Sequence, residues 1–294
     1  MNKFGIVILN YMAWNETIEC LESIIKQKWA NTIKIYVVEN GSPNESLVKL
    51  KEYREINNYF ELVISEKNLG FAKGNNLGIK EAKKDGCDYV IISNPDIIFY
   101  KDDNFLEKIE NLYKIDDKLA LISPKIINET GNIATPYAYF PISFTQKLKW
   151  IFFYLTYFYK IYYFLRVYVF FDYITKKSFS KKKKKSKILP RDVLSSYVYA
   201  SQGAFIILTP AFFTKFAGFF DKTFLFCEEF IIAELLYQAK LKEYFYTDIC
   251  VLHKGSKTME LVNRNYKDKV KFTLKHRFES CKYYVKIFLK GLFK

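Results

Sequence analysis

The first hundred residues alternate between short apolar runs and longer segments whose apolar residues recur at helical spacing. The apolar runs cover residues 4–9, 33–38, 61–64 and 89–93, and the helical segments cover residues 15–27, 44–55 and about 71–84. A short continuous apolar run is typical of a strand that is buried on both faces. This alternation predicts an α/β fold with a mostly parallel, doubly wound sheet, in which ligands bind at the carboxyl ends of the strands.

The alternation stops after about Pro136 and resumes near residue 200. A strand is expected at 203–208, a helix from about Phe226 and a strand at 244–252. Between the two parts, Trp150–Tyr173 contains 14 aromatic residues, and a lysine run follows at Lys181–Lys185. We interpret this block as an aromatic and basic helical insertion in one α/β domain. The expected boundaries are 1–136, 137–195, 196–256 and 257–294.

Positive charge is concentrated in two segments. Thr145–Arg191 carries a net charge of +12 and Tyr266–Lys294 carries +7, whereas the whole chain carries +15, so the remainder carries −4. The last segment alternates apolar and lysine positions at helical spacing, which predicts a basic amphipathic helix. Its apolar positions are Leu274, Phe278, Cys281, Val285, Phe288 and Leu292. We expect His276, in the same segment, to be solvated.

Three interpretations of these basic, aromatic segments stay open. An anionic membrane surface comes first, because tyrosine and tryptophan favour the lipid interface and lysines bind anionic headgroups. A helical subdomain that packs on the core comes second. Nucleic acid is not expected as a partner, because the aromatic residues are denser than a base-stacking surface needs.

The compartment is predicted from cysteines and hydropathy. The five cysteines form no CxxC pair, which is typical of reduced thiols in a cytosolic protein. The apolar start is too short for a signal-peptide core. No stretch of 18 residues is free of charged side chains, so a membrane-spanning helix is not expected. We therefore expect a cytoplasmic protein, peripheral to the inner membrane on its cytoplasmic face.

Polar clusters follow the first four predicted strands. Asn10 ends the first strand, and Glu39 ends the second, where its carboxylate can accept hydrogen bonds from a ribose or a base. A turn or helix cap is the stronger interpretation of Glu39 on local sequence alone. The third cluster is Asn68–Gly78, whose three glycines would let the backbone approach a ligand. Its hydrogen-bond donors are Asn68, Lys73 and Asn75.

The fourth cluster, Ser93-Asn94-Pro95-Asp96, follows the strand at 89–92. A carboxylate in this position suits Mg²⁺ or Mn²⁺, because hard cations prefer oxygen ligands. A plain Asn-Pro-Asp turn fits the local sequence equally well.

Taken in order, these clusters resemble the GT-A-fold glycosyltransferases of family 2, especially the rhamnosyltransferase-like branch that builds bacterial surface polysaccharides. The resemblance continues downstream and covers roughly residues 4–136 and 200–256. Its downstream motifs are Gly203–Ile207, Gly218–Asp221, Phe224–Glu229 and His253. It implies a Rossmann-like, mostly parallel sheet flanked by helices.

The resemblance also implies roles for single residues. Asp96 and His253 would hold Mg²⁺ or Mn²⁺, and Glu229 would be the catalytic base, where the family ordinarily has the aspartate of a Glu-Asp pair. A structural histidine and a helix-dipole interaction of Glu228-Glu229 are the alternatives. The residues expected to bind the nucleotide sugar are Asn10, Glu39, Asn68, Lys73, Asn75 and Asn94.

The predicted function is inverting, metal-dependent hexosyl transfer from a nucleoside-diphosphate sugar to a lipid-linked or polysaccharide acceptor. The branch suggests rhamnose as the sugar and O-antigen, capsule or lipooligosaccharide as the product. Two alternatives stay open: a sugar nucleotidyltransferase, and a catalytically silent GT-A-fold assembly protein at the membrane.

Overall fold

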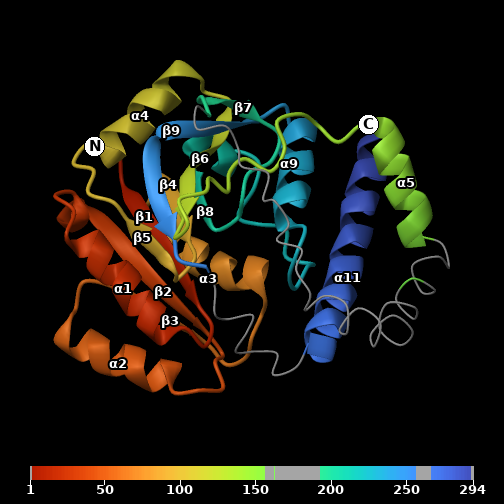
Figure 1. The fold of residues 1–294 in the computed structure, drawn as a ribbon. Coiled ribbons are helices and arrows are strands. Elements are labelled where there is room, and N and C mark those ends of the chain that lie inside the picture. The colour runs from red at the N-terminus through yellow and green to blue at the C-terminus, as the bar shows by residue number, and fades with distance from the viewer. Residues whose placement is uncertain (1, 156–161, 163–192, 256–265, 293–294) are drawn as a thin grey trace.

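The computed structural model describes residues 2–155, 162, 193–255 and 266–292 (Figure 1). Its strands form one nine-stranded sheet within this part of the chain, in the order β3-β2-β1-β4-β8-β6-β9-β5, with β7 paired to β9. The strands are β1 (Phe4–Asn10), β2 (Ile33–Asn40), β3 (Glu61–Ser65), β4 (Tyr89–Ser93), β5 (Ile97–Phe99), β6 (Leu119–Asn128), β7 (Ser196–Val198), β8 (Phe205–Leu208) and β9 (Lys242–His253).

The helices lie on both faces and at one end of this sheet (Figure 1). They are α1 (Trp14–Ile25), α2 (Ser46–Ile56), α3 (Phe71–Lys84), α4 (Phe105–Ile115), α5 (Phe144–Leu155), α8 (Pro210–Phe213), α9 (Glu228–Gln238) and α11 (Tyr266–Leu292), with a 3₁₀ turn η1 (Ala30–Thr32). The predicted α/β architecture is therefore confirmed, including the amphipathic C-terminal helix.

The strands β1 to β4 form the parallel half of the sheet. Strand β1 pairs in parallel with β2 and with β4, and β2 pairs in parallel with β3. Beyond β4 the sheet is mixed, because β8 runs antiparallel to both β4 and β6, while β6 and β9 are parallel. The order of the strands reverses between β1 and β4, which is where open α/β sheets bind ligands.

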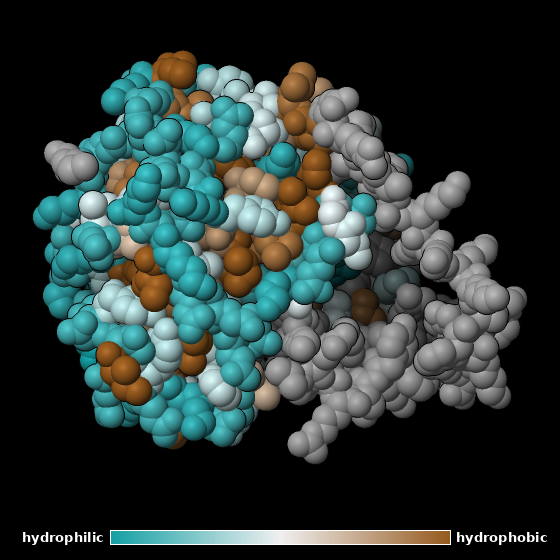
Figure 2. Space-filling view, turned by 60° about the vertical axis from the view of Figure 1, so that its left-hand side comes forward, coloured by the Kyte–Doolittle hydropathy of each residue, from teal (hydrophilic) through white to brown (hydrophobic). Residues whose placement is uncertain are grey.

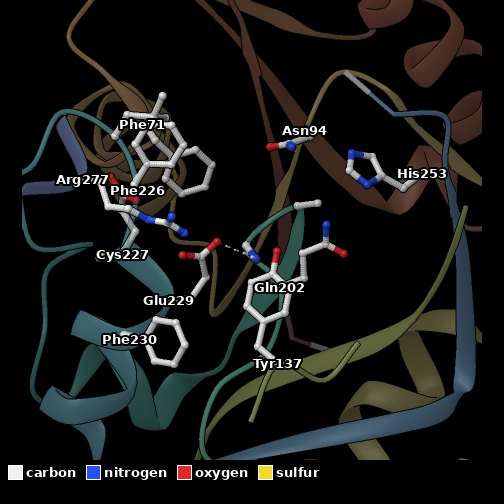
Figure 3. Close-up of a pocket in the computed structure, with 14 residues that line it drawn as sticks. Phe71, Asn94, Tyr137, Gln202, Phe226, Cys227, Glu229, Phe230, His253 and Arg277 are labelled. Carbon is white, nitrogen blue, oxygen red and sulfur yellow. Dashed lines mark hydrogen bonds between the residues drawn. The ribbon is translucent and has the colours of Figure 1, made fainter. Parts of the chain in front are cut away.

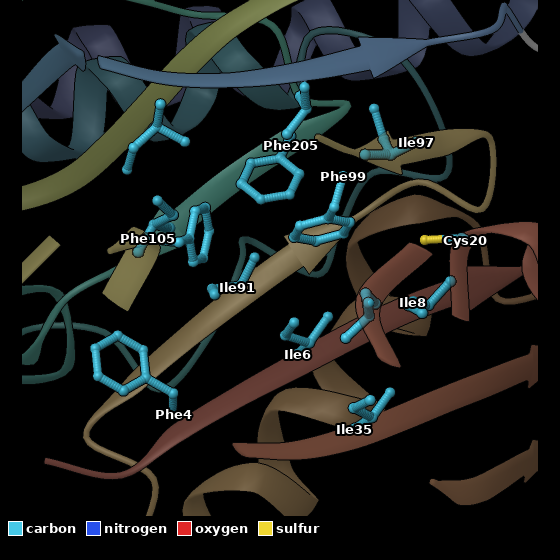
Figure 4. Close-up of a cluster of buried hydrophobic side chains, with 14 of the residues drawn as sticks. Phe4, Ile6, Ile8, Cys20, Ile35, Ile91, Ile97, Phe99, Phe105 and Phe205 are labelled. Carbon is cyan, nitrogen blue, oxygen red and sulfur yellow. The ribbon is translucent and has the colours of Figure 1, made fainter. Parts of the chain in front are cut away.

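The core consists of two apolar clusters, one on each face of the sheet. Successive side chains of a strand point to opposite faces, so Ile6 and Ile8 of β1 lie in one cluster and Val7 lies in the other. The first cluster packs under α1 and α4, and within it the rings of Phe99 and Phe105 meet edge to face (Figure 4). Both faces are thus covered by protein, as the continuous apolar runs predicted.

The C-terminal helix α11 packs against α9 and α5, and Figure 1 shows α5 and α11 side by side. Its apolar residues Cys281, Val285 and Phe288 are buried. The expectation that this apolar face lies in a membrane interface is corrected for these residues, which contact protein instead.

A buried ion pair joins α5, which lies in the predicted insertion, to the rest of the fold. The Nζ of Lys147, in α5, lies 2.7 Å from Oε2 of Glu234 in α9, and the two side chains are 6% and 3% exposed. The hydroxyl of Tyr199 donates to the same carboxylate oxygen at 2.8 Å. Lys147 also lies 4.3 Å from the ring centre of Phe288 in α11. One basic residue of the insertion is therefore used inside the protein.

The expected membrane contacts fall mostly on residues 156–161 and 163–192, which lie outside the described part of the chain. Among the described residues, no helix has both the length and the apolar character needed to cross a bilayer. On the face turned forward in Figure 2, hydrophobic side chains form separate patches among hydrophilic ones. Scattered patches of this kind are ordinary on a protein surface.

Candidate active site

A first cavity of about 460 Å³, here called the strand-end cavity, opens at the carboxyl ends of β1, β2 and β4. Its polar lining consists of Asn40, Asn68, Asn94 and Asp96. Its remaining wall is largely apolar and aromatic, with Leu9, Tyr11, Phe71, Phe224, Phe226 and Phe272. The cavity combines a flat aromatic surface with a few amide groups and one carboxylate, a lining that suits a ligand with an aromatic ring and polar substituents.

Two asparagines fix the loops at the edge of this cavity. Asn40 accepts a hydrogen bond from the backbone N–H of Leu69 at 3.0 Å and donates to Oδ1 of Asn68 at 3.2 Å. The same Oδ1 accepts the backbone N–H of Gly70 at 2.8 Å. The end of β2 is thereby held to the loop after β3. Of these two side chains, only Asn68 was predicted, as a residue that binds the nucleotide sugar.

The glycines of Asn68–Gly78 serve close packing within the protein. Gly70 has φ +82°, and a Cβ there would lie 2.1 Å from the carbonyl oxygen of Phe224. A Cβ at Gly74 or Gly78 would lie 2.6 Å from Leu9 or 2.4 Å from Val7, both in β1. These glycines let α3 approach the sheet and let its first turn approach Phe224. Gly70 also lines the strand-end cavity, and the expectation that the glycines let the backbone approach a ligand stays a prediction.

Asp96 and His253 are brought together by a strand pair that local sequence does not reveal. Asp96 directly precedes β5, and His253 ends β9, which pairs with β5 so that Ile97 lies opposite His253. The Nε2 of His253 lies 3.1 Å from Oδ2 of Asp96. These atoms are not aligned for a hydrogen bond, and neither side chain atom has a hydrogen-bond partner among the described residues. Asp96 is only 3% exposed.

Unpartnered buried oxygens beside an imidazole nitrogen are what a divalent cation would satisfy. In the described part of the chain, no group of three or more His, Cys, Asp or Glu side chains could hold a metal. The pair fits a cation only if a bound ligand supplies further oxygen atoms, as phosphates do.

A second cavity of about 340 Å³, here called the helix-end cavity, lies at the amino end of α9 (Figure 3). Glu229 points into it, and the backbone N–H of Gly203 lies 3.4 Å from Oε1 of Glu229. The other residues that carry polar groups there are Asn94, Tyr137, Gln202, Glu228, His253 and Arg277.

Both glutamates at the start of α9 have raised pKa values. Burial, and to a smaller extent the charge of the neighbouring Glu229, raise the pKa of Glu228 to about 8. Burial also raises the pKa of Glu229, while the backbone N–H groups of Glu229 and Gly203 and the charge of Arg277 act in the opposite direction. A carboxylate with a raised pKa that faces a cavity is suited to accept a proton near neutral pH.

The two cavities adjoin. Phe71, Asn94, Leu225 and Phe226 line both of them. Phe226 and Cys227 have φ values of +73° and +65°, so the chain turns sharply just before Glu228. The shared residues therefore form the boundary between the two cavities. A ligand in the strand-end cavity would lie on one side of this boundary, and Glu229 lies on the other.

The predicted site residues fall into two groups. Asn68, Asn94 and Asp96 line the strand-end cavity, and Glu229 and His253 line the helix-end cavity. The remaining four predicted residues line neither cavity. These four are Asn10, Glu39, Lys73 and Asn75.

Three of those four are engaged elsewhere, and the fourth is exposed. The carboxylate of Glu39 accepts the backbone N–H groups of Gly41 and Ser42 at 3.1 and 2.9 Å, which is the turn that local sequence favoured. Asn10 accepts hydrogen bonds from Ala13 and Thr17, and Asn75 donates to the backbone of α3. Lys73 is exposed on α3. Their predicted contacts with a nucleotide sugar stay predictions.

Several lining residues were not predicted, and two of them come from α11. Phe272 lines the strand-end cavity and Arg277 lines the helix-end cavity. His276 was expected to be solvated, but its side chain is 14% exposed. Its ring centre lies 4.6 Å from that of Phe224 and 4.4 Å from that of Phe272. The only available signal was that α11 is amphipathic, which does not say what its apolar face contacts.

Comparison with known proteins gives a family and a fold. A model of the family described as glycosyl transferase family 2 matches residues 5–183. A crystal structure of GalNAc-T7 with UDP, GalNAc and Mn²⁺ has a TM-score of 0.57 and 16% sequence identity, and the match covers 86% of this chain and 43% of that chain. No curated protein sequence matches.

Two structures of the S. aureus protein TarS are also similar. TarS 1–349 in complex with UDP has a TM-score of 0.53 and 14% identity, covering 94% of this chain and 71% of that chain. A longer TarS structure has a TM-score of 0.53 and 15% identity, covering 94% of this chain and 43% of that chain. The chain thus spans less than half the length of GalNAc-T7 and of the longer TarS chain.

Proposed function

The chain belongs to glycosyl transferase family 2, and from this premise we propose that it transfers a sugar from a nucleoside-diphosphate sugar to an acceptor hydroxyl group. The observation that carries the proposal is the pair of adjoining cavities, one with Asp96 in its lining and the other with Glu229. Each cavity suits one of the two substrates that such a reaction needs.

The donor would occupy the strand-end cavity. Its aromatic wall suits stacking of a nucleobase, and Asn94 and the Nδ2 of Asn68 offer amide groups to the ribose and phosphates. The GalNAc-T7 and TarS structures with bound UDP support a nucleotide of this general kind. The rhamnosyltransferase resemblance suggests rhamnose as the sugar, and the nature of the base and sugar is part of the proposal.

Asp96 and His253 would hold a Mg²⁺ or Mn²⁺ ion beside the donor diphosphate. Two observations support this assignment: their close, unaligned contact at 3.1 Å, and the absence of hydrogen-bond partners among the described residues for both Asp96 oxygens and for the His253 Nε2. When bound, such an ion neutralises charge on the leaving diphosphate. The Mn²⁺ in the GalNAc-T7 structure is consistent with a divalent cation in this fold.

Glu229 would act as the base. Its carboxylate would take the proton of the acceptor hydroxyl while that oxygen forms a bond to the anomeric carbon and the bond from this carbon to the diphosphate breaks. Attack on the face opposite the leaving group inverts the configuration of the anomeric carbon. The acceptor, a glycan or a lipid-linked glycan, would enter through the helix-end cavity.

The proposal is tested by thermal shift with a panel of nucleotide sugars, each with and without Mn²⁺. We expect at least one donor to raise the melting temperature only when Mn²⁺ is present, because binding to the folded state alone stabilises it. The variant Asp96→Ala should lose this metal-dependent increase. Asp102→Ala, which changes a carboxylate outside both cavities, is the matched control.

Two outcomes would contradict the proposal. One is the absence of a metal-dependent shift with any donor, and the other is an undiminished shift in Asp96→Ala. Release of pyrophosphate from a nucleoside triphosphate and a sugar phosphate would instead identify a nucleotidyltransferase.

A further inference from the structure

The C-terminal helix α11 is fixed to the segment that separates the two cavities. The hydroxyl of Ser280 donates to the backbone carbonyl of Leu225 at 2.9 Å. The sulfur atom of Cys281 lies 3.1 Å from that of Cys227, the residue just before the Glu228-Glu229 pair. These contacts hold the helix in place relative to the start of α9, which carries Glu229.

Arg277 lies one helical turn before Cys281, and residues four apart in a helix lie on the same side. Its side chain is therefore directed to the same region, where it lines the helix-end cavity. Figure 3 shows its guanidinium group directed toward the Glu229 carboxylate. The charge of Arg277 acts on Glu229 to favour the ionised carboxylate, against the effect of burial.

In the part of the chain that the structure describes, the other groups around Glu229 do not provide a permanent positive charge. Glu228 lies beside it on α9, and Tyr137 and Glu243 approach it from the segment after β6 and from β9. Among the described residues, His253 and Arg277 are the basic side chains that line the helix-end cavity. An arginine stays charged at every pH at which the protein is folded.

We propose that Arg277 is a positioning residue that keeps the Glu229 carboxylate ionised and directed into the helix-end cavity. The C-terminal helix is then a part of the active site rather than an appendage to it. The functional consequence rests on the proposed role of Glu229 as the base, but the effect of Arg277 on Glu229 can be measured without any substrate.

The first measurement is a pH titration of the protein labelled with ¹³C at the glutamate Cδ, followed by NMR. The Glu229 signal is identified by its absence in Glu229→Gln. We expect Arg277→Gln to move the Glu229 midpoint upward by about 0.5–1 pH unit, because an opposite charge is lost. Arg277→Lys should restore most of the shift, since it restores the charge.

Lys275→Gln is the matched control, because it removes one positive charge from the same turn of α11 without touching either cavity. In Lys275→Gln, the midpoint of the Glu229 titration should be the same as in the unmodified protein. An unchanged midpoint in Arg277→Gln, or an equal shift in Lys275→Gln, would overturn the inference whatever the enzyme's activity.

The second measurement is the pH profile of kcat/KM with the donor found in the thermal-shift panel. In Arg277→Gln the loss of activity should be larger at pH 6 than at pH 8.5, by up to about 3–10-fold, which is the largest difference that a midpoint shift of 0.5–1 pH unit can produce. A loss that is the same at both pH values would mean that Arg277 acts in some other way. Failure of Glu229→Gln to reduce transfer would contradict the proposed base and leave the NMR result standing.

Discussion

Glu229 combines two properties that do not usually occur together: it faces a cavity, and its surroundings make the charged form costly. A buried carboxylate with a raised pKa is destabilising when ionised, so such groups are kept where chemistry requires them. The backbone N–H of Gly203 and the charge of Arg277 reduce that cost without removing it.

We therefore expect Glu229→Gln to reduce the transfer rate by about 10²–10⁴-fold, the usual contribution of a general base. The amide has nearly the same shape, so the Mn²⁺-dependent thermal shift by the donor should persist. Transfer rate and donor-induced shift are measured on the same preparation. Full transfer activity in Glu229→Gln would exclude Glu229 as the base.

Glu228 gives a prediction for stability. Its pKa is raised to about 8 in the folded protein, above the ordinary glutamate value, so the folded state is favoured at low pH. This stabilisation is lost as the pH rises through about 8. Glu228→Gln should raise the melting temperature at pH 8 by about 2–4 °C and change it little at pH 5. An equal increase at both pH values would contradict a titrating Glu228.

At the scale of elements, the ion pair of Lys147 and Glu234 is the polar centre of the contact between α5, α9 and α11. Its two side chains are almost fully buried, so the loss of one partner leaves an uncompensated charge inside the protein. Hydrogen bonds from Tyr199 and Gln238 complete the surroundings of Glu234.

Glu234→Ala should lower the free energy of unfolding by about 3–5 kcal/mol. The double variant Lys147→Met with Glu234→Leu should lower the free energy of unfolding much less, because it leaves no buried charge without a partner. The exposed pair of Lys49 and Glu52 is the control, and Glu52→Ala should cost less than about 1 kcal/mol. Denaturant unfolding measures all three, and equal losses in the single and double variants would contradict the argument.

The sequence predicts elements well where the physical signal is local. Strands β1, β2 and β4 are continuous apolar runs, and all of them were expected. Strand β5 has only three residues and β7 has three, so neither has a recognisable period. Yet β5 is the strand that brings Asp96 to His253. The pairing of Asp96 with His253 followed only from resemblance to a family.

The same limit applies to α11. Its amphipathic pattern predicted a helix and an apolar face, and both are present. The partner of that face is set by tertiary packing, and no local feature of residues 266–292 indicates that α9 and α5 cover it. Arg277 was for this reason counted with the basic surface, although it lines the helix-end cavity.

At the scale of the whole molecule, the charge is divided between an α/β part with a small negative net charge and two basic segments. Burial of Cys281, Val285 and Phe288 removes the apolar face of α11 from any membrane contact. The aromatic residues expected to contact a membrane lie mostly at 156–161 and 163–192, outside the described part of the chain. The electrostatic part of the expected membrane binding comes from lysines and arginines near anionic headgroups, each contributing about 1 kcal/mol. Such binding is weakened by salt, whereas hydrophobic insertion is not.

We accordingly expect the full chain to sediment with vesicles that contain about 30% phosphatidylglycerol and not with pure phosphatidylcholine vesicles, since only anionic headgroups attract its lysines. Raising the salt from about 0.1 M to about 0.5 M should release it. Replacing all five lysines of Lys181–Lys185 by glutamine should weaken binding more than an equal loss of charge elsewhere. The matched control replaces five exposed lysines of the α/β part: Lys26, Lys51, Lys80, Lys101 and Lys114.

Two results would contradict this view of the basic segments. The first is binding to phosphatidylcholine vesicles that persists at about 0.5 M salt, where electrostatic attraction is strongly screened. It would indicate hydrophobic insertion by the aromatic residues of Trp150–Tyr173. Equal weakening in the lysine-run variant and in its control would show that only total charge matters. If binding is salt-sensitive and depends on Lys181–Lys185, the predicted insertion is the part of the molecule that binds the membrane. The role of α11 is then its contacts with α9 and with the helix-end cavity.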